Sequence, residues 1–167
     1  MTVEVTVASG DAMRELGRAL AQDLRAGDLV VLTGPLGAGK TTLAQGIGTG
    51  LDVRGQVASP TFIIARTHAS NGDGPSLVHV DAYRLTSLAE LDHLDLDTSL
   101  DSAVTLVEWG EGKAETLSED RLEVVIDRQR GGELDLAEPE RGDRTVRITA
   151  HGSRWEGVDL TRVAVMP

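Results

Sequence analysis

The sequence contains no cysteine, and aromatic residues make up only 2% of its 167 residues. The absence of cysteine excludes disulfide bonds and thiolate metal sites, and it fits a reducing compartment such as the cytoplasm. The N-terminus has no basic stretch followed by an apolar one, so we expect no secretory signal. No apolar run is long enough to span a membrane. We therefore expect a cytoplasmic protein with no membrane partner.

Basic residues are also scarce, since 16 Lys and Arg stand against 27 Asp and Glu, for a net charge of −11. A broad nucleic-acid surface needs clustered Lys and Arg, so this balance argues against one. It is compatible with a basic protein partner, but charge alone does not identify one. Lysine is the rarer of these two basic residue types, since only Lys40 and Lys113 occur.

One of these two lysines lies in a glycine-rich stretch, residues 34–41, which reads Gly-Pro-Leu-Gly-Ala-Gly-Lys-Thr and matches the phosphate-loop pattern. A short apolar run of strand length, residues 29–32, precedes it, and residues 42–47 follow with apolar side chains at helical spacing. Glycines let backbone N–H groups approach phosphate oxygens, and the helix directs its positive end at them. We predict a nucleotide site in which Lys40, in a solvent-facing loop, reaches the β- and γ-phosphates and Thr41 ligates Mg²⁺. The alternative is a glycine-rich turn that matches by chance, which the flanking segments make less favourable.

The rest of the chain alternates between strand and helix patterns. Ser9 is a candidate N-cap of the first helix, and apolar residues at helical spacing predict that this helix runs from residue 12 toward Gly27. Glycines weaken the second helix, so its end, near Leu51, is undefined. We expect residues 62–66 and 77–81 to form an antiparallel hairpin, and residues 122–126 to pair with 145–149. The further predicted elements are a strand over 2–7, a strand over 104–107, a short helix over 87–96, a helical turn over 114–117 and a loop over 128–144.

This order predicts one α/β domain over residues 1–167, with a mixed, partly parallel sheet flanked by helices in three layers. Residues beyond 150 are expected to form a weakly defined tail.

Two carboxylates, Asp81 and Glu108, follow apolar strands directly. Ligands of α/β sheets bind outside the carboxyl ends of strands, so either carboxylate could hold Mg²⁺ or orient an attacking water. The alternative is that each strand simply ends in a polar residue. Thr61, in a proline-containing loop, is a candidate switch residue that senses the γ-phosphate, or else it caps its own turn. Trp109 either packs on the nucleotide or fills core space, and His79 is interpreted as a hydrogen-bonded structural histidine.

Four runs in this order resemble the TsaE (formerly YjeE) family of small bacterial ATPases. The phosphate loop alone occurs in many families, whereas the four runs together are specific. The resemblance extends over residues 3–150, apart from the insert at 69–75. The runs are residues 34–42 (GPLGAGKTT), 59–62 (SPTF), 79–85 (HVDAYRL) and 107–111 (VEWGE).

The resemblance implies a P-loop NTPase-like fold and a slow ATPase that acts with two partners, TsaB and TsaD. Those partners transfer a threonylcarbamoyl group to the adenosine 3′ of the anticodon in tRNA, which TsaE would contact only indirectly. The cofactors implied are ATP and Mg²⁺. The resemblance also assigns residue roles. Phosphates would be held by Gly37, Ala38, Gly39, Lys40, Thr41 and Thr42. The metal would be held by Thr41, Glu108 and Asp81. Thr61 would be the switch, and Arg144 would lie near the nucleotide.

Two other functions share the phosphate loop. A small-molecule kinase would need a second substrate pocket, for which residues 128–144 are the only candidate lid. A GTP-driven switch usually carries an Asn-Lys-x-Asp run, but the only asparagine, Asn71, is not followed by lysine. We therefore favour the ATPase.

Overall fold

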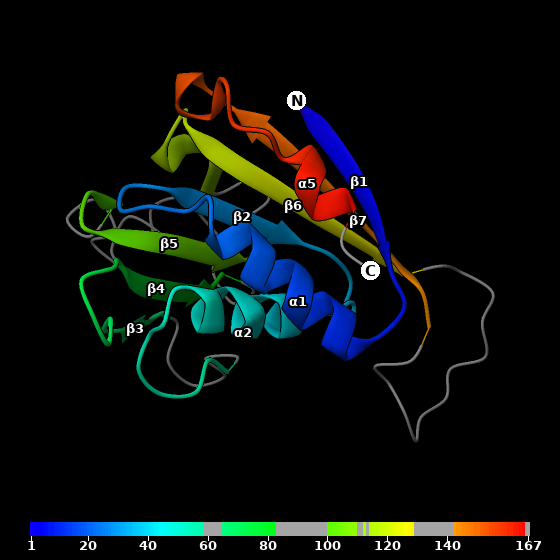
Figure 1. Ribbon diagram of the computed structural model, residues 1–167, viewed down its shortest axis with the longest axis horizontal. Coiled ribbons are helices and arrows are strands. Elements are labelled where there is room, and N and C mark those ends of the chain that lie inside the picture. The colour runs from blue at the N-terminus through cyan, green and yellow to red at the C-terminus, as the bar shows by residue number, and fades with distance from the viewer. Residues whose placement is uncertain (59–64, 83–99, 110–111, 113, 129–141, 166–167) are drawn as a thin grey trace.

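The computed structural model describes residues 1–58, 65–82, 100–109, 112, 114–128 and 142–165. Within these ranges, seven strands form one sheet in the order β1-β7-β6-β2-β5-β4-β3 (Figure 1). The elements are β1 (Thr2–Val7), α1 (Gly10–Ala21), β2 (Leu29–Thr33), α2 (Lys40–Gly50), β3 (Ala65–His68), β4 (Ser76–Asp81), β5 (Ala103–Glu108), η1 (Ala114–Leu117), β6 (Arg121–Arg128), β7 (Arg144–His151), η2 (Ser153–Trp155) and α5 (Thr161–Ala164).

The sheet is mixed, as the sequence predicts. Strands β2, β4, β5 and β6 run parallel to one another, β7 is antiparallel to β6, and β3 is antiparallel to β4. Both predicted antiparallel pairs are therefore confirmed. In the first of them, β3 (Ala65–His68) ends two residues beyond the predicted end at residue 66, and residues 62–64 lie outside the described ranges. β3 is an edge strand with two exposed central residues, so pairing with β4 sets its limits more than its own apolar pattern does.

Helices α1 and α2 lie together on one face of the sheet (Figure 1). The Ser9 hydroxyl caps α1 by accepting a hydrogen bond from the Ala12 amide at 3.1 Å, as expected. The helix ends at Ala21, earlier than the apolar spacing suggested, because the following amides bond to carbonyls three residues back and tighten the chain into turns.

Glycine sets the distance between these two helices. A Cβ on Gly46 of α2 would lie 2.2 Å from the Arg14 carbonyl oxygen, and a Cβ on Gly17 of α1 would lie 2.5 Å from that of Leu43. The glycines that lower the helix propensity of α2 therefore allow its backbone to approach α1 closely. This packing presses α2, and the loop before it, against the sheet.

The opposite face of the sheet carries a second apolar cluster. Val31, Val78, Val80 and Val107 belong to it, and Leu117 of η1 packs against it. The helix predicted over 87–96 lies outside the described residues, as does most of the loop predicted over 128–144. No helix in the part of the chain that the structure describes is both long and apolar enough to cross a membrane.

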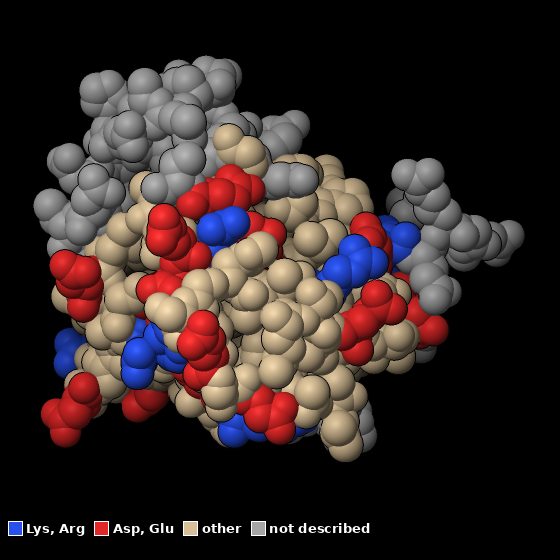
Figure 2. Space-filling model, turned by 90° about the horizontal axis from the view of Figure 1, so that it is seen from above, with Lys and Arg blue, Asp and Glu red and all other residues tan. Residues whose placement is uncertain are grey.

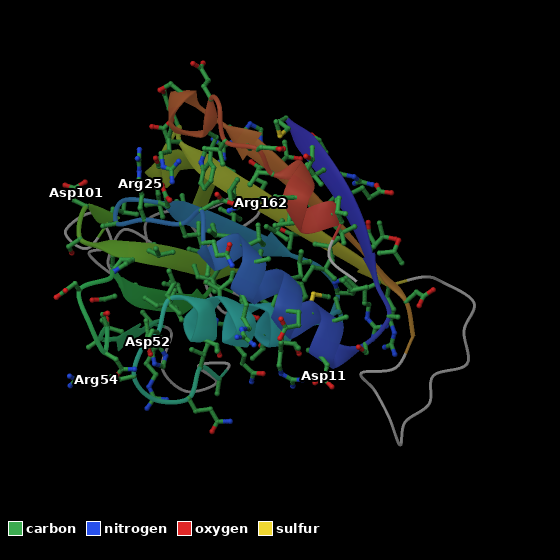
Figure 3. The ribbon with its side chains drawn as sticks, viewed as in Figure 1. Asp11, Arg25, Asp52, Arg54, Asp101 and Arg162 are labelled. Carbon is green, nitrogen blue, oxygen red and sulfur yellow. The ribbon has the colours of Figure 1, made fainter. Side chains whose placement is uncertain are left out.

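The segment after β7 differs from the weakly defined tail that was expected. Trp155, Leu160 and Val163 are buried in the main core. Arg154 donates to both carboxylate oxygens of Asp28, at 2.9 and 2.8 Å. Arg162 of α5, labelled in Figure 3, pairs with Asp23 at 2.5 Å. Widely spaced apolar residues and two ion pairs dock this segment, and neither produces a periodic signal in the sequence.

Candidate nucleotide-binding site

The parallel strands place several polar groups at one edge of the sheet. The carboxyl ends of β2, β4, β5 and β6 all lie at this edge, so the phosphate loop after β2 is flanked by residues that end the neighbouring strands. Asp81 ends β4 and Glu108 ends β5, and the two are directly paired in the register of these strands. The structure thus brings together the two carboxylates that the sequence singled out.

The phosphate loop adopts a conformation that requires glycine. Gly37 and Gly39 have φ angles of 76° and 111°, in the left-handed region. A Cβ on Gly34 would lie 2.6 Å from the Ile126 carbonyl oxygen of β6, so the loop passes close to the neighbouring strand. Gly39 caps α2 without a side-chain hydrogen bond, which leaves the first amides of the helix facing the loop. Such amides bind anions well.

Lys40 is buried, with 6% of its surface exposed, although residues 35–37 of the loop before it are exposed as expected. Its Nζ donates to the carbonyl oxygens of Gly34 at 2.7 Å and Pro35 at 2.9 Å. It also lies 3.9 Å from the centre of the Trp109 ring. Burial lowers the pKa of Lys40 from its usual value, while the charges of Glu108 and Asp81 act against that shift. The loop carbonyls and the indole ring enclose the ammonium, which the sequence could not show.

Trp109 has a φ angle of 60°, which is unusual for a bulky side chain. Its amide still donates to the Leu32 carbonyl oxygen at 2.9 Å, extending the pairing of β5 with β2. This backbone conformation places the ring over Lys40, where the ring faces a cation. Of the two roles left open for Trp109, the structure supports a place in the site rather than one in the core.

Glu108 is also buried, with 3% of its surface exposed, and each of its oxygens has a partner. Thr41 donates its hydroxyl to Oε1 at 3.1 Å, and the His79 Nε2 lies 2.5 Å from Oε2. His79 is therefore the hydrogen-bonded histidine that was expected, but its partner is a site carboxylate. Its spacing from Asp81 offered a signal, because residues two apart in a strand share a face.

Two arginines reach the phosphate loop from β6 and β7. The Nε of Arg144, a buried side chain, donates to the Ala38 carbonyl oxygen at 3.2 Å. Arg128, its register partner, has a guanidinium nitrogen 3.9 Å from where a Cβ on Gly37 would stand. Burial, and after it the charge of Arg128, lowers the pKa of Arg144 from its usual value. Arg128 was not predicted, although it ends a strand next to β2.

The family described as threonylcarbamoyl adenosine biosynthesis protein TsaE has a model that matches residues 7–134 of the chain. The chain belongs to the TsaE family.

Similar proteins agree with this assignment. The chain is 59% identical over 153 residues to the tRNA threonylcarbamoyladenosine biosynthesis protein TsaE of Streptomyces coelicolor, covering 91% of the chain and 99% of that protein. It is 35% identical over 144 residues to the TsaE of Bacillus subtilis, covering 86% and 82%. The crystal structure of Bacillus subtilis YdiB matches with a TM-score of 0.69 and 29% identity, over 93% of this chain and 90% of that one.

The donor set of this TsaE-family site fits Mg²⁺. The Thr41 hydroxyl and the carboxylates of Glu108 and Asp81 supply oxygen atoms, which this hard cation prefers. Among the residues that the structure describes, no three or more His, Cys, Asp or Glu side chains gather into a metal cage. Mg²⁺ at a nucleotide usually binds through one or two carboxylates, waters and phosphates, so the set is compatible with it.

Some of the TsaE motif residues lie outside the described ranges. Thr61, with its run at 59–62, is one of them, and so are Tyr83, Arg84 and residues 110–111. The other predicted site residues are described and belong to the same edge of the sheet. They are Gly37, Ala38, Gly39, Lys40, Thr41, Thr42, Asp81, Glu108, Trp109 and Arg144.

Proposed function

We propose that the chain binds ATP with Mg²⁺ and hydrolyses it slowly, and that it supports a TsaB–TsaD-type complex in the threonylcarbamoylation of tRNA. The observation that carries the proposal is the convergence of Lys40, Thr41 and Glu108 on one phosphate loop. The names of the relatives supply the pathway, because those proteins are named for tRNA threonylcarbamoyladenosine biosynthesis.

The residues divide the work of binding between them. Amides of the loop and of the first turn of α2 hold the phosphates, and Lys40 supplies the positive charge. To do so, the ammonium exchanges its bonds to Gly34 and Pro35 for phosphate oxygens while it stays near the Trp109 ring. Arg144, fixed to the Ala38 carbonyl, adds a second positive charge beside the loop.

Hydrolysis requires the acidic side of the site. Mg²⁺, when bound with the nucleotide, neutralises charge on the β- and γ-phosphates. Thr41 and Glu108 would hold it, and Asp81, adjacent to Glu108, is placed to share this role or to orient water. The chain itself would not transfer the threonylcarbamoyl group.

The surface supports an indirect contact with tRNA. Figure 2 shows acidic side chains spread over one face with basic ones scattered between them. With a net charge of −11, the chain is a poor counterion for a phosphate backbone. This charge balance is consistent with a partner protein that handles the tRNA. The chain would act in the cytoplasm, as one domain over residues 1–167.

The test is calorimetric titration of the purified chain with ATP and GTP in Mg²⁺, together with an assay of phosphate release. We expect ATP to bind and to yield inorganic phosphate without a phosphorylated co-product. A phosphorylated small molecule would instead favour a kinase, and preference for GTP would favour a guanine-nucleotide switch. Failure of ATP to bind would contradict the proposal.

A further inference from the structure

His79 of β4 is fully buried, with 0% of its surface exposed, yet it makes a polar contact with the candidate site. Its Nε2 lies 2.5 Å from Oε2 of Glu108. An ionised carboxylate only accepts hydrogen bonds, so when Glu108 is ionised the hydrogen of this contact is on Nε2. The other ring nitrogen, Nδ1, has no hydrogen-bond partner among the described residues. Within the described part of the chain, Glu108 is therefore the hydrogen-bond partner of the imidazole.

This contact decides how Glu108 presents its two oxygens. The carboxylate is 3% exposed, so solvent does little to hold it. With Oε2 bound by His79, Oε1 is the oxygen nearer to the Thr41 hydroxyl on the first turn of α2, at 3.1 Å, while that hydroxyl lies 3.4 Å from Oε2. Without His79, the carboxylate would lose a buried donor and could turn about its last side-chain torsion.

We infer that His79 is a positioning residue, whose Nε2–H bond holds Glu108 with Oε1 toward Thr41 and so prepares both groups for a divalent cation. The inference rests on the proposed function, since it concerns the Mg²⁺ of that site. In this arrangement His79 would act on the cation only through Glu108. Outer partners of metal ligands typically change metal affinity or activity by about 10–100-fold when they are removed.

Two substitutions at this position separate positioning from mere core filling. His79→Leu fills the position with an apolar side chain and removes the N–H donor. His79→Gln retains an N–H donor near the place of Nε2. His68→Leu is the matched control, because His68 is also buried at a strand position but bonds to the Arg54 carbonyl oxygen. Melting temperatures measured alongside show whether each variant folds.

The first readout is ATP affinity with Mg²⁺ and with EDTA. We expect His79→Leu to weaken Mg²⁺-dependent binding by about 10–100-fold while affinity in EDTA stays unchanged. His79→Gln should recover most of the loss, and His68→Leu should behave as the unmutated chain does. Equal losses in both His79 variants, or none in His79→Leu, would overturn the inference.

The second readout needs no nucleotide. In ¹⁵N spectra of the histidine rings, the signal that disappears in His79→Gln belongs to His79. We expect it to show the hydrogen on Nε2, and to shift in Glu108→Gln, in which an amide replaces the carboxylate. A hydrogen on Nδ1 alone, or no response to Glu108→Gln, would overturn the positioning contact. If the unmutated chain instead fails to bind Mg²⁺–ATP while these spectra are as expected, the proposed function fails and the contact stands.

Discussion

At the scale of single residues, the site is built from charges that are enclosed rather than exposed. Lys40, Glu108 and Arg144 are all buried, and each is held by named partners in the loop or the strands. Motif runs identified Lys40 and Glu108, because motif spacing reflects chemistry, whereas Arg144 came only from the family resemblance. The sequence could not show that Trp109 covers Lys40 or that His79 holds Glu108, because each contact joins segments far apart in the chain.

Lys40→Ala should abolish nucleotide binding with little loss of stability. The ammonium supplies charge to phosphates, and its burial lowers its pKa, so the charged form is less favoured in the folded chain than in the unfolded one. ATP affinity and melting temperature should be measured side by side. Arg25→Ala is the charge-matched control, because exposed Arg25 lies before β2 at the opposite edge (Figure 3). ATP affinity unchanged from that of the unmutated chain would contradict the role of Lys40.

Glu108→Gln should lower the hydrolysis rate more than it lowers ATP affinity. The amide keeps the shape of the side chain but removes a negative charge whose effect grows as charge moves in the transition state. Asp81→Asn serves as the comparison, because Asp81 is the register partner of Glu108. Steady-state phosphate release and equilibrium binding separate the two effects. If only one substitution slows turnover, the other carboxylate is simply a strand-end residue.

At the scale of elements, the central strands were predictable because they are buried on both faces. Continuous apolar runs marked β2 and β5, and alternation marked β1 and β7. Less could be predicted where tertiary contacts override local pattern. The edge strand β3 ends two residues later than predicted, and the docking of η2 and α5 through Arg154 and Arg162 left no periodic trace. The contact between α1 and α2 was hidden for a similar reason, because a glycine looks the same whether it weakens a helix or allows close packing.

Gly46→Ala tests that packing. Alanine favours helix by about 1 kcal/mol, but its Cβ would lie 2.2 Å from the Arg14 carbonyl oxygen, so overpacking should dominate. We expect a net loss of about 1–3 kcal/mol in the free energy of unfolding, measured by denaturant titration. Gly72→Ala is the control, since a Cβ there would meet nothing within 4 Å. A Gly46→Ala variant as stable as the unmutated chain would mean that α1 and α2 separate without cost.

At the scale of the whole molecule, the proposed function depends on coupling the site to a partner. The phosphate loop, Asp81, Glu108 and the arginines converge on one edge of the sheet, so a ligand there contacts the ends of several strands at once. The run at 59–62, which carries the candidate switch Thr61, is outside the described residues, so its role stays a prediction. Under the proposed function another protein would handle the tRNA, because a chain with a net charge of −11 is a poor counterion for a phosphate backbone.

The coupling itself can be measured as a free energy. If Thr61 belongs to a switch, ATP orders residues 59–62 and changes affinity for TsaB–TsaD, and by reciprocity the partner tightens ATP binding by the same factor. A coupling of about 1–3 kcal/mol, or roughly 5–150-fold, is typical. Its physical cause would be a contact from Thr61 to the γ-phosphate or the metal that ADP cannot offer.

The experiment titrates the chain against TsaB–TsaD with a non-hydrolysable ATP analogue, with ADP and without nucleotide. We expect the analogue to give the tightest binding, and Thr61→Ala to bring its curve close to that for ADP. Thr67→Ala is a matched control, because Thr67 is an exposed threonine on β3, beyond the switch run. Equal affinity in all three conditions for the unmutated chain would leave an ATPase without a switch, since a ligand that does not discriminate between two states cannot shift their populations.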